Sequence, residues 1–105
     1  MSAYIRPMSR PTSAAVRQNI ARCRFELDAG GDMAFANYFT SEGVVAITHT
    51  ETPPALRGRG IGSQLVLGML AQIRAQGLKV RPLCSFASRV IAQHPEVQDL
   101  LARPA

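Results

Sequence analysis

The sequence has no long hydrophobic run, and this absence limits the class of protein. Of its 105 residues, 47% are hydrophobic and 18% are charged, yet no apolar stretch approaches the ~20 residues that a membrane-spanning helix needs. The start of the chain has no sustained apolar segment and no clear cleavage site, unlike a secretory signal. We expect a cytoplasmic protein without a membrane partner, folded as one domain with one core.

Cysteine is also scarce, since Cys23 and Cys84 are the only two. Neither belongs to a Cys-x-x-Cys pair or has the cysteine–histidine spacing typical of zinc sites, so the sequence predicts no metal site. In a cytoplasmic protein we expect both thiols to be reduced.

Acidic residues are missing from the first quarter of the chain. No acidic residue precedes Glu26, and the seven basic residues after it are balanced by seven acidic ones, so the net charge of +5 belongs to the start. We interpret residues 1–18 as an irregular basic leader and residues 19–105 as the folded domain. The leader is either a solvated tail or a contact for nucleic acid, and the tail is favoured.

Three segments have the pattern of β-strands. Polar and apolar side chains alternate in residues 21–27, residues 33–39 place large apolar side chains on one face, and residues 44–50 are rich in β-branched residues. The apolar side chains that share a face are Cys23, Phe25 and Leu27 in the first segment and Met33, Phe35 and Phe39 in the second. Turns at 28–32 and 40–43 separate the segments. The sequence therefore predicts a three-stranded antiparallel meander.

The second half of the chain has helical spacing. Apolar residues recur on one face of a predicted helix over residues 60–76, namely Ile61, Leu65, Val66, Met69, Leu70 and Ile73. Gly77 is the expected C-terminal cap. Residues 78–84 form a fourth strand, parallel to the third if the helix is a βαβ crossover. A second helix covers residues 85–93, and a short last helix starts at Pro95.

The fold class predicted from this order is α/β (α+β). It has a mixed, mostly antiparallel sheet of about four strands, a βαβ crossover helix and a second C-terminal helix.

The loop before the crossover helix reads Arg57, Gly58, Arg59, Gly60, Ile61 and Gly62. Each glycine weakens a helix start by about 1 kcal/mol relative to alanine, so this loop is either a flexible turn or a site. A strand, a glycine loop and a helix in this order direct backbone N–H groups at an anion. ATP and NAD are disfavoured, because the chain has neither the Lys-Ser or Lys-Thr of a P-loop nor the spacing of a dinucleotide fingerprint.

This loop, with its Pro-x-x-x-Arg-Gly frame, resembles the acyl-CoA pyrophosphate loop of the GNAT superfamily of N-acetyltransferases. FELDAG, HTETPPALRGRGIG, the Leu83-Cys84 pair and HPEVQDLL resemble, in this order, the small minimal GNAT-like proteins over residues 22–101. The resemblance implies that residues 57–62 bind the pyrophosphate of acetyl-CoA, and that the pantetheine arm inserts between the third and fourth strands. The implied activity is acetyl-CoA-dependent N-acetyl transfer to a primary amine.

Acetyl transfer also needs a base and an acid. His49 and Glu51, two apart at a strand end, are candidates for the base, or are ordinary polar residues. Members of the superfamily carry asparagine, alanine and tyrosine after the last strand, where this sequence has Cys84, Ala87 and Ile91. Because Ile91 cannot donate a proton, Cys84 is the candidate for the missing acid or for an acetyl-accepting nucleophile. The alternative is a small core residue.

The acceptor site is expected to be open, because residues 28–32 are too few for the helices that usually wall it in this superfamily. An open cleft suits a protein lysine, a peptide or a polyamine. Two other functions stay open: a non-catalytic acyl-CoA-binding protein, and a basic nucleic-acid-binding module whose affinity would fall steeply with salt.

Overall fold

The computed structural model describes residues 16–103 and contains a five-stranded sheet in the order β1-β2-β3-β4-β5. The strands are β1 (Val16–Asn19), β2 (Arg24–Ala29), β3 (Asp32–Ser41), β4 (Val44–Glu51) and β5 (Lys79–Pro82). The first four form an antiparallel meander, and β5 is parallel to β4. The predicted fold class and the βαβ crossover are confirmed, while the sheet has one strand more than expected.

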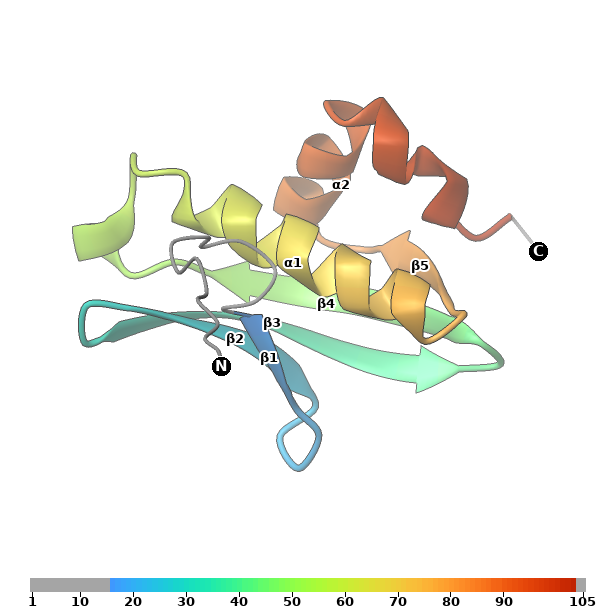
Figure 1. Ribbon diagram of the computed structural model, residues 1–105, viewed down its shortest axis with the longest axis horizontal. Coiled ribbons are helices and arrows are strands. Elements are labelled where there is room, and N and C mark those ends of the chain that lie inside the picture. Colours follow the sequence, from blue (N-terminus) through green and yellow to red (C-terminus); the bar gives the residue numbers. More distant parts are fainter. Residues whose placement is uncertain (1–15, 104–105) are drawn as a thin grey trace, which may run out of the picture.

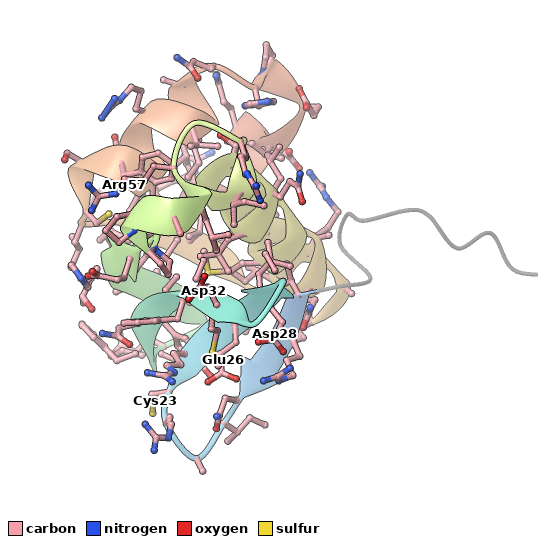
Figure 2. The ribbon with its side chains drawn as sticks, turned by 90° about the vertical axis from the view of Figure 1, so that its left-hand side faces the viewer. Cys23, Glu26, Asp28, Asp32 and Arg57 are labelled. Atoms are coloured by element: carbon pink, nitrogen blue, oxygen red, sulfur yellow. The ribbon has the colours of Figure 1, made fainter. Side chains whose placement is uncertain are left out.

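The additional strand is β1, part of which was assigned to the leader. Val16 pairs with Leu27 and Asn19 with Arg24, so the segment predicted as one strand over 21–27 contains the turn of a hairpin. Cys23, with a φ of 53°, is exposed at that turn (Figure 2) and does not contribute to the core face. Regular alternation through Cys23 hid the turn. The rest of the predicted leader, residues 1–15, lies outside the described residues.

The crossover helix α1 (Ile61–Ala75) packs across the sheet (Figure 1). Its predicted apolar stripe is confirmed, because Leu65, Val66, Met69, Leu70 and Ile73 are fully buried. Gly77 ends the helix with a φ of 75°, and the Leu78 N–H donates to the Ile73 carbonyl at 3.1 Å. This pattern is that of a Schellman cap, as expected for glycine at this position.

Both α1 and the second helix, α2 (Ser85–Ala92), lie on the same face of the sheet (Figure 1). Within residues 16–103, no helix covers the opposite face, which we call the helix-free face. Met33, Phe35 and Phe39 do share a face, but it is this one, and Phe39 is 53% exposed. The core receives the small side chains of Ala34 and Ala36 instead, which leave room for α1.

The helix-free face contains a buried carboxylate, Glu26, whose side chain points away from the helices (Figure 2). Glu26 accepts hydrogen bonds from Arg24 at 2.7 Å, from Arg17 at 2.9 Å and from Asn19 at 3.0 Å. The Arg24 guanidinium also lies 4.5 Å from the centre of the Phe35 ring. Side chains rather than a helix therefore keep water from Glu26 on this face.

The end of the described chain closes the free edge of β5. The short 3-10 helix η3 (Pro95–Leu100) starts at Pro95, as predicted. The Ala102 N–H then donates to the Val80 carbonyl at 2.8 Å. None of the helices between residues 16 and 103 has the length and apolar character needed to cross a membrane.

Candidate functional site

β4 and β5 are paired over only part of their length. Their parallel register runs from Val44 opposite Lys79 to Ile47 opposite Pro82, and the Leu83 N–H adds a bond to the Ile47 carbonyl at 2.9 Å. Beyond this point the chain turns into α2, whereas residues 48–51 continue along β3. We call the gap between residues 48–51 and the start of α2 the opening. It lies between the two strands that the resemblance to the GNAT superfamily implies for the pantetheine arm.

A β-bulge at Thr48 determines which side chains face each side of the opening. Asn37 pairs with His49 while Tyr38 pairs with Ile47, so Thr48 is the extra residue on β4. Because directly paired residues share a face of the sheet, His49 and Glu51 lie on the helix-free face. Thr50 lies on the helix side, where its Oγ1 is 3.4 Å from the Cys84 Sγ.

A cavity of about 490 Å³ lies beside the opening. It is lined by His49, Thr50, Glu51, Thr52, Leu56, Arg57, Gly58, Gly60, Ile61, Gly62, Ser63 and Phe86. The structure therefore brings the predicted loop residues other than Arg59 together with His49 and Glu51. Cys84 is not a lining residue and lies behind Thr50.

The loop follows the 3-10 helix η2 (Pro54–Leu56) and lines one end of the cavity. Gly58 and Gly60 have φ values of 82° and 76°, a region that favours glycine. The Gly60 carbonyl accepts from the Gln64 N–H at 3.0 Å, so the N–H groups of residues 61–63 precede the first intrahelical bond. The first turn of α1 has no acidic residue. This end of the cavity suits an anion.

The third glycine of the loop has a different role. A Cβ on Gly62 would lie 2.8 Å from the Cζ of Phe86 and 3.2 Å from the Oγ1 of Thr52. Gly62 therefore lets the Phe86 ring of α2 pack directly on the start of α1. Phe86 and Leu56 supply an apolar part of the cavity lining.

The charged residues of the cavity come from the loop and from β4. The Arg57 Nε donates to the Thr52 carbonyl at 3.2 Å and ties the loop to the end of β4. His49 Nε2 and Glu51 Oε1 are 2.8 Å apart, which confirms that these two side chains share a face. The Phe35 ring lies beside the His49 ring, with 6.4 Å between their centres. An imidazole–carboxylate pair thus stands at the opening.

Cys84 is the N-cap of α2, and its Sγ accepts from the Ala87 N–H at 3.5 Å. Burial opposes the thiolate and would raise the pKa of Cys84. Hydrogen bonds from Thr50 and from the backbone N–H groups of Ala87 and Phe86 outweigh burial, so this pKa lies below its usual value. Ile91 is buried in the core and has no part in the cavity.

Sequence reasoning missed several residues that line the cavity, namely Thr50, Thr52, Leu56, Ser63 and Phe86. Thr52 and Ser63 are close to the motif in sequence, so proximity alone could have suggested them. Phe86 gives no local signal, because it approaches Gly62 only through the packing of α2 on α1.

Comparison with known proteins identifies the family of the chain. The family model for the GCN5-related N-acetyl-transferase matches residues 24–100. Protein NATD1 of Xenopus tropicalis is 28% identical over 96 residues, which cover 89% of this chain and 88% of that protein. Protein NATD1 of Homo sapiens is 31% identical over 62 residues, which cover 59% of this chain and 55% of that protein.

A solved structure gives the same result for the fold. The NMR solution structure of a GCN5-like protein from Staphylococcus aureus matches with a TM-score of 0.65 and 25% identity, over 93% of this chain and 94% of that one. The chain therefore belongs to the GCN5-related N-acetyltransferase family.

Proposed function

We propose that this protein transfers the acetyl group of acetyl-CoA to a primary amine, and that residues 57–62 bind the pyrophosphate of CoA. The supporting observation is a single cavity that joins a glycine loop at a helix start to the opening beside β4. The first feature suits a diphosphate. The second provides a place for an extended arm that ends in a thioester.

In this proposal the backbone N–H groups of residues 61–63 donate to the diphosphate, and Arg57 and Arg59 add positive charge. Leu56 and Phe86 pack on the apolar arm. Backbone N–H groups released by the Thr48 bulge polarise the acetyl carbonyl, since a bulge disrupts regular pairing.

The chemistry is direct transfer in this proposal. His49 accepts a proton from the acceptor ammonium, and Glu51 orients the imidazole through their 2.8 Å contact. The amine nitrogen bonds to the acetyl carbon, and the bond from that carbon to sulfur breaks. The departing CoA thiolate takes a proton from the Cys84 thiol through the Thr50 hydroxyl, whose oxygen is 3.4 Å from the Cys84 Sγ. The new amide nitrogen loses its second proton to solvent. His49 then releases its proton to solvent and Cys84 takes one up, so that one proton is released in each turnover. An acetyl-cysteine route is less favoured, because Cys84 does not line the cavity.

Calorimetry with CoA tests the binding half of the proposal. We expect binding by the unmodified chain and loss of binding in Gly60→Asp, which adds negative charge and a side chain at a φ of 76°. Gly77→Asp is the matched control, because Gly77 has a φ of 75° at the other end of α1. If Gly60→Asp and the unmodified chain had equal affinity for CoA, the proposal that residues 57–62 bind the pyrophosphate would be wrong.

Turnover and salt separate this proposal from its alternatives. A non-catalytic CoA-binding protein would bind CoA and yield no acetylated product with any amine in a panel. A nucleic-acid-binding module would show affinity for nucleic acid that falls steeply with ionic strength. We expect acetylated amine as the product, by mass spectrometry.

A further inference from the structure

The helix-free face has a second hollow beside the opening. Its volume is about 390 Å³, and its lining comprises Phe39, Ser41, Glu42, Val44, Ala46, Arg81, Leu83 and Arg103. Phe39 pairs with Ala46, and Ala46 pairs with Arg81, so these three residues are cross-strand neighbours on one face. The small Ala46 side chain between two long ones produces the depression.

The lining of this hollow combines apolar surface with positive charge. Phe39 is 53% exposed and Leu83 is 58% exposed, which is unusual for large apolar side chains on a folded domain. Arg81 donates to the Arg103 carbonyl at 3.2 Å. Arg81 forms no ion pair with an acidic residue in the described part of the chain. Glu42 is the one acidic residue of the lining. A ligand with an apolar group and a carboxylate fits this hollow.

The hollow lies close to the His49–Glu51 pair. Ala46 precedes His49 by three positions on the same strand, and a strand rises about 3.3 Å per residue, so the two features are roughly 7–10 Å apart. Asn37, which pairs with His49, is two residues from Phe39 on the same face of β3. One end of this surface thus offers a carboxylate to an ammonium, and the other offers an arginine to a carboxylate.

We propose that the acceptor amine is a lysine side chain of a polypeptide that crosses the helix-free face, with an apolar residue and a carboxylate near that lysine bound by Phe39, Leu83 and Arg81. This inference rests on the acetyl transfer proposed above. It narrows the acceptor from primary amines in general to a lysine with an acidic neighbour two residues away, on the same face of an extended chain.

The shape of the surface favours a polypeptide over a small amine. β2 and β3 are joined by the two residues Gly30 and Gly31, so no inserted segment between these strands walls the helix-free face. Phe39 and Leu83 are largely exposed, and a small amine at Glu51 would not reach them. An extended peptide spans both features, since residues two apart share one face of an extended chain and are about 7 Å from each other, and Asn37 can hydrogen-bond its backbone.

The test uses the peptide acetyl-Lys-Ala-Glu-Ala-Leu-amide, in which Lys, Glu and Leu share one face of an extended chain. It also uses a peptide with the reversed sequence, and copies of both peptides with glutamine in place of glutamate. Acetylation is followed with acetyl-CoA, and peptide binding is measured separately by NMR titration of the labelled protein. Arg81→Gln and Phe39→Ser are the variants. Arg22→Gln is the matched control, because Arg22 is an exposed arginine at the β1–β2 turn.

We expect Arg81→Gln to lower kcat/KM and affinity for the glutamate peptide by about tenfold, the size of a lost charge-assisted hydrogen bond, with little effect on the glutamine peptide. Phe39→Ser should weaken both peptides, and it keeps the test valid if Arg81→Gln loosens the contact with Arg103. Arg22→Gln should change neither, and CoA affinity should stay constant in all three variants.

Three results would overturn the inference. The first is an equal effect of Arg81→Gln on the glutamate and glutamine peptides, and the second is that free lysine is as good a substrate as the peptides. The third is a dimer in sedimentation that is lost when Phe39 is changed, because this would assign the hollow to a second copy of the chain. A failure of the proposed acetyl transfer can be distinguished from a failure of this inference. If only the acetyl transfer is wrong, no amine would be acetylated, while the protein would still bind the glutamate peptide and Arg81→Gln would still weaken that binding.

Discussion

The Cζ of Phe86 lies 2.8 Å from the point that a Cβ on Gly62 would occupy. The start of α2 therefore touches the start of α1 only because position 62 has no side chain. Both residues line the cavity proposed for CoA, so the width of that cavity and the packing of the two helices depend on the same contact.

Gly62→Ala should therefore affect the cavity more than the fold. Alanine favours a helix over glycine by about 0.5–1 kcal/mol, which offsets part of the cost of moving the tip of the Phe86 ring. The displaced ring narrows the cavity, and we expect CoA affinity to fall about tenfold, within the usual range for overpacking. Calorimetry and thermal unfolding measure the two effects. Adding Phe86→Leu to Gly62→Ala should restore CoA affinity. If Gly62→Ala alone left CoA affinity unchanged, the proposed narrowing of the cavity by Phe86 would be wrong.

His49 and Glu51 are expected to act on turnover without affecting cofactor binding. Loss of the base in His49→Gln should lower kcat about 10²–10⁴-fold. Glu51→Gln should lower it less, because the imidazole remains and loses only its orienting carboxylate. Steady-state kinetics checks both, with Asp32→Asn as a control that removes an exposed acid from the β2–β3 turn. A change in CoA affinity of similar size would argue against separate roles.

The lowered pKa of Cys84 predicts a pH profile for its alkylation. The hydrogen bond between the Thr50 hydroxyl and this sulfur favours the thiolate, so Thr50→Val should remove it and raise the pKa of Cys84. The pH of half-maximal reaction with iodoacetamide should then move upward. Mass spectrometry of the digested chain follows the peptide that contains Cys84 separately from the one with Cys23. A profile that does not move would show that Thr50 leaves the thiolate unaffected.

Glu26 should make stability depend on pH in the acid range. The hydrogen bond from Arg24 is the largest cause of the lowered pKa of Glu26; burial opposes it, and bonds from Asn19 and Arg17 add to it. A carboxyl with a depressed folded-state pKa stabilises the protein above its unfolded pKa, about 4.3. That contribution is lost as pH falls through the lower folded value.

Glu26→Gln should therefore lower the free energy of unfolding by about 1–3 kcal/mol at pH 7, the range for breaking hydrogen bonds of a buried charged group. The difference between the unmodified chain and the variant should be smaller at an acid pH below the unfolded-state pKa than at pH 7. Urea titrations at the two pH values measure this difference. Asp28→Asn, which removes an exposed partner of the same Arg17, is the control and should cost less. A difference that grows toward acid pH would contradict the linkage.

Most of the fold could be predicted from sequence patterns within single helices and strands. The stripe from Leu65 to Ile73 and the cap at Gly77 depend on spacing within one helix, so both could be predicted from the sequence. The loop glycines were found for the same reason. The turn at Cys23 could not be predicted in this way. The polar–apolar alternation continues through the turn, so only the pairing of β1 with β2 reveals it.

The parts that could not be predicted depend on distant partners. Nothing in the sequence marks Thr48 as the extra residue, since a bulge exists only relative to the register of β3. The contact between Phe86 and Gly62 likewise joins two helices through their packing. The hollow at Ala46 arises because Phe39 and Arg81 come from the strands on either side.

The bulge at Thr48 affects both the shape of β4 and the face of the sheet on which His49 lies, and these two effects can be separated. If residues 48–51 paired with β3 in a regular register, Thr48 would oppose Asn37 and the imidazole of His49 would turn toward the helices. Deleting Thr48, in contrast, would leave His49 opposite Asn37 and remove only the kink. In an alignment with relatives, a gap at position 48 would therefore indicate a β4 without the kink. The side chains that follow the gap would still lie on the same faces of the sheet.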